Sequence, residues 1–409
     1  MDLPTPRYGL KARYLFPVDR PPIADGLLVV DRGRIAAVGV AAPDCETIDL
    51  GNVALIPGLV NAHVHLEFSD LAQPLGNAGI RLPEWIRLVL DYRAGRAPDQ
   101  ASQTTVARNV QNGLAQSIRH GTTLLGEISS GDWPLTSADH PPIDTVVFRE
   151  VICLRPQQVA EVVDYLDRHL RAAAASQAWQ PAVSPHAPFT CRPEALQLAI
   201  ETSRRHRIPL AMHLAESPEE IQWMKTGGGP LAELLENRQS ETYTGPTTVR
   251  DILNQLTRAH RTLVIHGNYL NDEEIQTVAA VRDRMSLVYC PRTHSYFQHA
   301  TYPLPRLLDA GLTVAVGTDG RGSNPDLSVL AELRHVAAEH PQLPLDQILK
   351  MGTLAGATAL GVDHRCGSLT PGKHAHFAVV SLPEIDAEDP HELLLHSDTP
   401  VQTTIFHGS

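Results

Sequence analysis

The sequence contains few cysteines, few lysines and no long hydrophobic run. Its five cysteines are scattered among 409 residues without a CxxC pair, which predicts reduced thiols and a cytoplasmic setting. No apolar run approaches the roughly 18 residues of a membrane span, and the first residues lack a signal-peptide core. The formal net charge is −12, with 34 basic and 46 acidic residues. This balance argues against a surface for nucleic acid or for an anionic membrane.

Histidine, in contrast, is abundant, with 20 copies in the chain. Hydrophobic residues make up 43% and charged residues 20%, which is typical of a folded globular protein and excludes global disorder. The length allows two or three domains. The positions of the histidines relative to the predicted strands therefore carry the most information about function.

Two kinds of pattern divide the chain into three segments. Residues 1–56 and 366–409 hold short β-like runs broken by Gly, Pro and Asp, and DRGR (31–34) is predicted to be a hairpin turn. Residues 57–365 alternate apolar β-rich runs with amphipathic helical stretches such as 156–175 and 193–206. The β-rich runs are 59–66, 121–130, 145–154, 181–190, 208–216, 262–270, 285–291 and 312–319.

Eight strands alternating with helices predict the α/β class and a closed (β/α)8 TIM-type barrel. A doubly wound open sheet is the alternative, but it normally carries a glycine-rich phosphate turn, and no GxGxxG occurs. The TGGGP segment at 226–230 is predicted to be a plain loop. Because a closed barrel has no free edge, we expect the C-terminal β-run to pair with the N-terminal runs in a small separate β-domain.

Ionisable side chains fall at the ends of five predicted strands. In chain order they are His63 and His65, His186, His213 with Glu216 just beyond it, His266, and Asp319. In a barrel these strand ends converge on the face where active sites lie. Residues i and i+2 of a strand point the same way, so His63 and His65 can bind one ion. A third histidine and an aspartate complete a ligand set suited to Zn²⁺ or Fe²⁺, with a position open for water.

Each of these residues also has a structural explanation. A single histidine at a strand end is more often a hydrogen-bonded structural residue, and HxH alone is a short pattern. The metal site is favoured because the residues fall independently at the ends of separate strands. Glu216 is placed to move a proton rather than to hold the ion. Glu67 and Cys290 are more simply structural.

Several motifs resemble the amidohydrolase superfamily over essentially the whole chain. These are PGLVNAHVHLEFS, AMHLAE, VIHGNYL and VAVGTD, which resemble its first, fifth, sixth and eighth strands. HxH with HLAE, and CPRT before GTD, are similar to the cytosine deaminase and chlorohydrolase branch. The resemblance implies a composite β-sandwich built from both chain ends, and a homodimer.

The resemblance also implies roles for individual residues. It implies that the metal ligands are His63, His65, His213 and Asp319. It implies that Glu216 shuttles a proton to the substrate, that His266 orients the bound hydroxide and that His186 contacts the substrate. We expect Asp319 and His266 to receive or orient the departing proton, and Glu216, as the acid, to protonate the ring nitrogen next to the attacked carbon.

The scarcity of lysine bears on the number of ions. Two-metal members of the superfamily bridge their ions with a carboxylated lysine or a glutamate, and no lysine lies between Lys11 and Lys225. Glu127 and Glu150 remain as bridging candidates, although both are more simply structural. We therefore predict one divalent ion, Zn²⁺ by preference and Fe²⁺ as the alternative.

NAHVHLEFS followed by LPEWI most resembles the aminodeoxyfutalosine deaminases. This implies hydrolytic deamination of a small heterocyclic substrate, an amino-substituted purine nucleoside. The chain departs from the usual pattern at Thr293 and His294, commonly Ser-Asn, at Gly320, often Ser, and at His376, commonly Asp. The alternatives are the same site acting on cytosine, guanine, methylthioadenosine or a chloro-triazine, and a catalytically silent scaffold. His294 and His299 are candidates for the substrate entrance.

Overall fold

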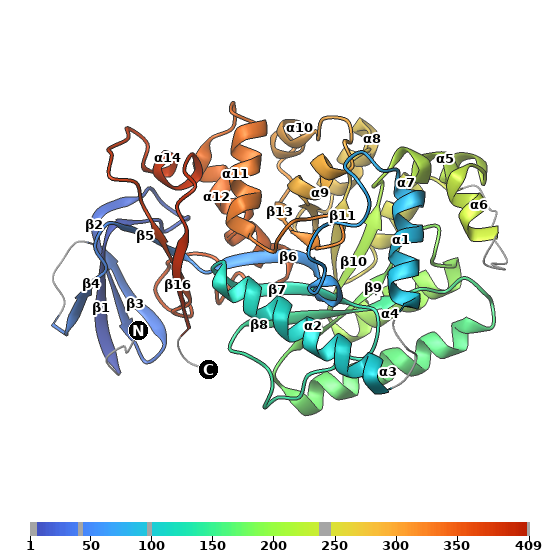
Figure 1. The fold of residues 1–409 in the computed structure, drawn as a ribbon, viewed down its shortest axis with the longest axis horizontal. Helices are drawn as coiled ribbons and strands as arrows, with labels where there is room; N and C mark the ends of the chain where they lie inside the picture. The colour runs from blue at the N-terminus through green and yellow to red at the C-terminus, as the bar shows by residue number, and fades with distance from the viewer. Residues whose placement is uncertain (1–5, 40–43, 96–99, 237–246, 407–409) are drawn as a thin grey trace.

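The computed structural model describes residues 6–39, 44–95, 100–236 and 247–406. Two β-sheets organise the chain, and Figure 1 shows them side by side, with the smaller sheet on the left. The larger sheet is surrounded by helices.

The smaller sheet is built from both ends of the chain, as expected. Its strand order is β16-β15-β5-β1-β2-β3, and β4 pairs with β1. The strands are β1 (Arg7–Leu15), β2 (Ile23–Asp31), β3 (Arg34–Gly39), β4 (Thr47–Asp49), β5 (Val53–Pro57), β15 (Phe377–Ser381) and β16 (Val401–Ile405). Asp31 pairs with Arg34 across a two-residue turn in which Arg32 and Gly33 both have positive φ, so the DRGR hairpin is confirmed. We call this sheet the composite sheet.

The larger sheet is entirely parallel. Its segments are β6 (Leu59–His65), β7 (Thr122–Ser129), β8 (Asp144–Val151), β9 (Gln180–Pro185), β10 (Pro209–Leu214), β11 (Arg261–His266), β12 (Met285–Tyr289), β13 (Val314–Val316) and β14 (Asp319–Gly320). Each begins within three residues of a run predicted from the sequence, except that the last run is split in two.

The split of the last run explains how this sheet curls. β13 pairs with β12, whereas β14, two residues further on, pairs with β6, the first strand of the sheet. One extended stretch therefore contacts both neighbours, and the arrangement fits a TIM-type barrel. The apolar side chains of Val60, Val146, Ala211 and Val288 fill the interior.

Helices follow most strands of this barrel and cover its outside (Figure 1). They are α1 (Leu82–Ala94), α2 (Gln100–Arg119), α3 (Gln158–Ser176), α4 (Pro193–His206), α5 (Pro218–Thr226), α6 (Pro230–Glu236), α7 (Val249–Leu256), α8 (Asp272–Ala279), α9 (Pro291–Tyr296), α10 (Leu304–Asp309), α11 (Val329–Glu339), α12 (Leu345–Met351), α13 (Leu354–Ala359) and α14 (Pro390–Leu395), with a short 3-10 helix at Leu66–Phe68. The TGGGP segment forms the end of α5 and a loop, as predicted. No described helix has the length and apolarity needed to span a bilayer.

Candidate active site

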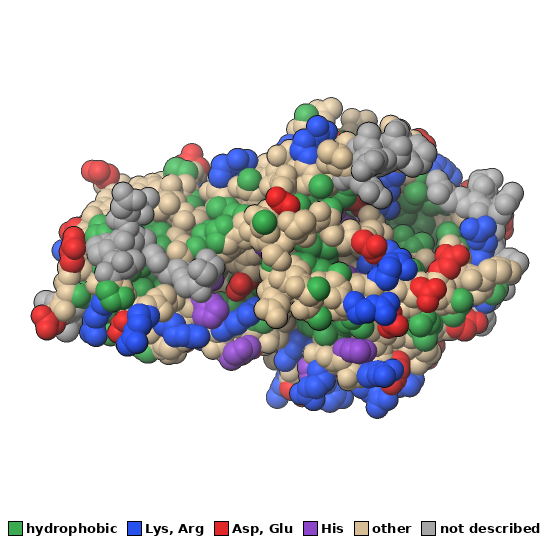
Figure 2. Space-filling model, turned by 90° about the horizontal axis from the view of Figure 1, so that it is seen from below, with side chains coloured by type: hydrophobic (Ala, Val, Ile, Leu, Met, Phe, Trp, Pro, Cys, Tyr) green, Lys and Arg blue, Asp and Glu red, His purple; other side chains and the backbone are tan. Residues whose placement is uncertain are grey.

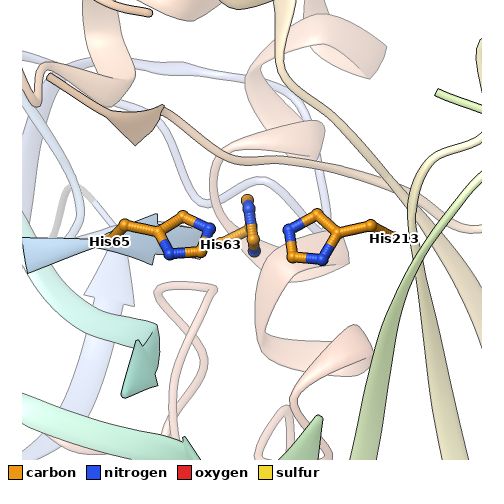
Figure 3. Close-up of side chains that lie close together, drawn as sticks. All are labelled: His63, His65 and His213. Carbon is orange, nitrogen blue, oxygen red and sulfur yellow. The ribbon is translucent and has the colours of Figure 1, made fainter. Parts of the chain in front are cut away.

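Three histidines predicted to bind metal meet at one end of the barrel. His63 and His65 end β6, and His213 lies near the end of β10. Figure 3 shows the ring of His63 between those of His65 and His213. One nitrogen from each ring lies within 4.8 Å of the other two. The structure therefore brings together side chains separated by 150 positions in the sequence.

Asp319 completes this group. Its Oδ1 lies 3.5 Å from Nε2 of His63 and 3.6 Å from Nε2 of His65. Burial alone would raise the pKa of Asp319, but the imidazoles of His63 and His65 lower that pKa below its usual range. The carboxylate is thus ionised at neutral pH and faces the three rings.

Strained backbone marks the strand ends around this group. Ala215, His266 and Asp319 have φ of 54°, 67° and 55°, in the left-handed region that residues other than glycine rarely adopt. Such a conformation costs on the order of 1–3 kcal/mol and persists only where the surroundings impose it. Ala215 and His266 lie at or just past the C-terminal ends of β10 and β11, and Asp319 begins β14 where the chain crosses from β13, so the turns direct side chains toward the site.

The burial of His63 tests whether this group suits a metal ion. The side chain is fully buried, and neither ring nitrogen has a hydrogen-bond partner among the described residues. Buried polar atoms without a partner are rare in native proteins and need an explanation, such as an ion. Burial lowers the pKa of His65 and of His213 well below 6.5, so both rings are neutral at pH 7, the form that binds a metal. The donor set therefore fits a divalent ion such as Zn²⁺.

Hydrogen bonds outside this group fix the orientation of His213. Its Nδ1 donates to the backbone carbonyl of His186 at 3.0 Å, which leaves Nε2 for an ion. The Nδ1 of His186 lies 2.6 Å from the hydroxyl of Thr190, and its Nε2 lies 3.8 Å from Glu150 Oε1. His186 thus supports His213 through its backbone and presents its ring to the cavity.

Glu216 follows the turn at Ala215, and its side chain lines the cavity. Its backbone N–H donates to Glu220 at 2.8 Å, and its carbonyl accepts from Asn268 at 2.9 Å. Its side chain is 12% exposed and lies 3.5 Å from Nε2 of His266. Burial, together with the charges of Asp319 and Glu220, raises the pKa of Glu216 well above 4.5. The protonated form of this carboxyl therefore persists to higher pH than that of an ordinary glutamate, and it can donate its proton.

His266 lies opposite Glu216 at the end of β11. Burial is the main reason that its pKa falls to about 3, so the imidazole is neutral at pH 7. Tyr302 donates a hydrogen bond to the backbone carbonyl of His266 at 3.0 Å, which holds the strained turn. The ring can accept a proton or a hydrogen bond at the site.

A chain of hydroxyl groups supports Asp319. Ser323 donates to Oδ2 of Asp319 at 3.0 Å, and the hydroxyl of Thr293 lies 3.0 Å from that of Ser323. Ser323 uses its only proton on Asp319, so Thr293 must donate to Ser323. This gives a structural role to Thr293, one of the positions that depart from the usual family pattern.

Gly320, another departure, lies against two other site residues. A Cβ atom there would lie 3.1 Å from Phe68 and 3.2 Å from Cβ of His65, closer than most carbon contacts. Glycine therefore lets the end of β14 approach β6 closely. A serine at this position would require His65 or Phe68 to move.

A cavity opens above these groups, and apolar side chains form its opposite wall. One face of α1 contributes Leu82, Trp85, Ile86, Val89 and Leu90, at helical spacing. Phe189, Leu234 and Leu235 complete this wall, whereas the polar floor is lined by His65, His186, His213, Glu216, His266 and Asp319. Trp85 also donates to the carbonyl of Gly322 at 2.9 Å, which holds α1 beside β14. The cavity suits a small molecule with an apolar face and polar groups toward the floor.

The remaining candidates have structural contacts. Glu67 is buried and forms an ion pair with Arg93, and Oε2 of Glu127 accepts from the backbone of Leu66 at 2.9 Å. Burial raises the pKa of Cys290 well above its usual value, so its thiol stays protonated. Glu150 lines the cavity beside His186.

The suggestion that His294 and His299 line the substrate entrance was wrong for the cavity described above, because neither side chain is among its lining residues. His294 donates to the carbonyl of Ala300 at 2.9 Å, and His299 lies 3.1 Å from the hydroxyl of Tyr269. Both rings belong to an aromatic cluster with Tyr302, behind the turn at His266.

Comparisons with known proteins agree with this geometry. The chain is 29% identical over 404 residues to a 5-methylthioadenosine/S-adenosylhomocysteine deaminase of Syntrophobacter fumaroxidans, covering 93% of this chain and 83% of the relative. It is 27% identical over 366 residues to an aminodeoxyfutalosine deaminase of Nitratiruptor, covering 87% and 86%. A zinc-bound adenosine deaminase structure from Xanthomonas campestris has a TM-score of 0.78 at 23% identity, covering 98% of this chain and 92% of that one.

The family comparison covers most of the chain. The model of the amidohydrolase family matches residues 54–409, which include every residue of the site described above. The resemblance found in the sequence motifs is therefore confirmed. The chain belongs to the amidohydrolase family and is a hydrolase of carbon–nitrogen bonds.

Proposed function

We propose that the protein is a metal-dependent hydrolytic deaminase of an amino-substituted purine nucleoside, either aminodeoxyfutalosine-like or adenosine-like. One observation carries this proposal: a histidine and aspartate group suited to a divalent ion lies beside a buried glutamate whose pKa is raised, below an apolar wall. The deaminase names of the two relatives support the reaction type.

The ion that we propose is a single Zn²⁺, with Fe²⁺ as the alternative, held by His63, His65, His213 and Asp319. Bound there, it would lower the pKa of a coordinated water and supply hydroxide near pH 7. The zinc in the Xanthomonas structure supports this choice of metal. The absence of lysine between Lys11 and Lys225 supports a single ion at this site.

Different residues of the chain would then carry out the separate proton transfers of the reaction. Glu216 donates its proton to the ring nitrogen next to the attacked carbon, which prevents negative charge from building on the ring. Asp319 and His266 orient the attacking hydroxide and receive its proton. That proton passes to the amino group as the carbon–nitrogen bond breaks, so that ammonia leaves and a carbonyl remains. His186 contacts the substrate from β9.

A panel of amino-purine nucleosides and amino-pyrimidines, assayed for ammonia release, tests the proposal. We expect the highest kcat/KM for an adenosine-like nucleoside. If a pyrimidine or a chloro-triazine is turned over faster, the site assignment stands but the substrate class is wrong. An inert protein that binds no metal would favour the silent scaffold and contradict the proposal as a whole.

Methylthioadenosine is the second candidate substrate, because the Syntrophobacter relative carries that activity in its name. Its sulfur-containing tail is apolar, whereas the tail of aminodeoxyfutalosine is larger and carries a carboxylate. Comparing kcat/KM for the two nucleosides in the same panel decides between them.

Several features expected from the sequence stay predictions. They are the segment boundaries at 56/57 and 365/366, a sandwich arrangement of the composite sheet, the homodimer and the cytoplasmic setting. Light scattering after size-exclusion chromatography measures the oligomeric state directly.

A further inference from the structure

A second group of metal-ligating side chains lies at the opposite end of the barrel from the candidate active site. Asp144 is the first residue of β8, and His374 and His376 precede β15 of the composite sheet. One possible ligand atom from each of these three residues lies within 4.8 Å of the other two. The rings of His374 and His376 have centroids 5.3 Å apart. Figure 2 shows histidine side chains at the surface near the junction of barrel and composite sheet.

The backbone that carries these side chains is held firmly. The N–H of His374 donates to the carbonyl of Arg365 at 2.9 Å, and the carbonyl of His376 accepts from Gly58 at 2.9 Å. Asp144 is paired with Leu124 in the parallel sheet. The backbone at all three positions is therefore hydrogen-bonded to neighbouring segments, which lowers the cost of assembling a site.

Asp144 provides a second, independent observation. Its Oδ2 is buried and has no hydrogen-bond partner among the described residues. The guanidinium of Arg365 forms an ion pair with this oxygen at 3.9 Å, beyond hydrogen-bond distance, and donates to the side-chain oxygen of Gln180 when that amide is oriented to satisfy both groups. Oδ2 of Asp144 is therefore still without a hydrogen bond and can bind a cation.

We propose that Asp144, His374 and His376 form a second divalent-metal site that ties the barrel to the composite sheet. Two imidazoles and one carboxylate suit Zn²⁺ and poorly suit Mg²⁺ or Ca²⁺. The site offers three protein ligands and lies close to Arg365, so it binds its ion more weakly than the four-ligand catalytic group. The catalytic group itself is still expected to hold one ion.

Position 376 gives the site its third ligand. The sequence there reads His374-Ala375-His376, an HxH pair with the same spacing as His63 and His65. In an extended segment the two side chains of such a pair can point the same way and face one ion.

Equilibrium dialysis of the purified holoenzyme against Zn²⁺, with metal measured by mass spectrometry, tests the proposal. We expect one tightly held equivalent and a second equivalent that is removed by mild chelation. We also expect added Zn²⁺ to raise the melting temperature, because an ion that binds only the folded state stabilises it. A wild-type protein that takes up no second equivalent would overturn the proposal without any variant.

Three single variants test whether the proposed residues bind the second equivalent of Zn²⁺. They are Asp144→Asn, His374→Gln and His376→Gln. Each should lose that equivalent and the Zn²⁺-dependent rise in melting temperature, but keep the first equivalent and full turnover, which also report correct folding. His364→Gln is the matched control, because His364 is exposed in the same region, and it should behave as wild type. A second equivalent that survives in all three folded variants would place the ion elsewhere and refute the assignment.

Discussion

Replacing Glu216 with Gln separates proton donation from metal binding. The amide keeps the size of the side chain and its place beside His266, but it carries no titratable proton. Glu216 lies in a site where burial already raises its pKa, so the wild-type carboxyl is poised as an acid. A general acid contributes about 10² to 10⁴ in rate, so turnover should fall by that factor. This corresponds to about 3–5 kcal/mol of barrier.

Ammonia release with the best substrate from the panel measures this loss, and metal analysis accompanies it. Glu216→Gln should keep a full equivalent of the catalytic ion, because Glu216 is outside the proposed ligand set. Glu219→Gln is the matched control, since Glu219 lies three residues further on and is not among the residues that line the cavity. Normal turnover by Glu216→Gln, or loss of its metal, would refute the role assigned to this residue.

Four further predictions rest on the same geometry. His63→Ala should lose the catalytic ion, and a full complement of bound metal in that variant would remove His63 from the ligand set. Ser323→Ala should lower metal affinity or turnover by about 10–100-fold, because it removes the hydroxyl that orients Asp319, whereas Ser323→Thr should restore both. Because the pKa of Glu216 is raised, its protonated form persists to higher pH than that of an ordinary glutamate, and a pH–rate profile should fall on the alkaline side as pH passes through that pKa. Because the pKa values of His65 and His213 are lowered, their neutral forms persist at low pH, so dialysis should show metal retained well below pH 6.5.

The arrangement of strands could be predicted because its causes are local. Each barrel strand is an apolar β-rich run bounded by turn residues, and this pattern is visible in a single sequence. The division of the last run into β13 and β14 was not visible, because it depends on β6 lying beside Asp319 once the sheet has curled. The single sheet formed by both chain ends was expected because a closed barrel has no free edge with which the C-terminal β-run could pair. No single motif predicted it.

The ionisable residues of the site could be predicted because they stand at strand ends, but the residues that orient them could not. Glu220 accepts hydrogen bonds from the backbone of Ala215 and Glu216, and in the sequence it is simply an acidic residue in the first turn of a helix. Ser323 and Thr293 lie 30 positions apart, and their contact exists only in the folded chain. Supporting contacts of this kind depend on tertiary structure, which residue patterns do not encode locally.

The pairing of β5 with β15 has a consequence for synthesis on the ribosome. Domains generally fold as units while the chain emerges from its N-terminus. Here β5 must wait for a partner that is translated more than 300 residues later, because β15 begins at Phe377 and β5 ends at Pro57. Until then the edge of β5 is uncovered and open to wrong pairing. Truncating the chain before β15 should therefore promote aggregation of the nascent protein even though every proposed catalytic ligand has already been made.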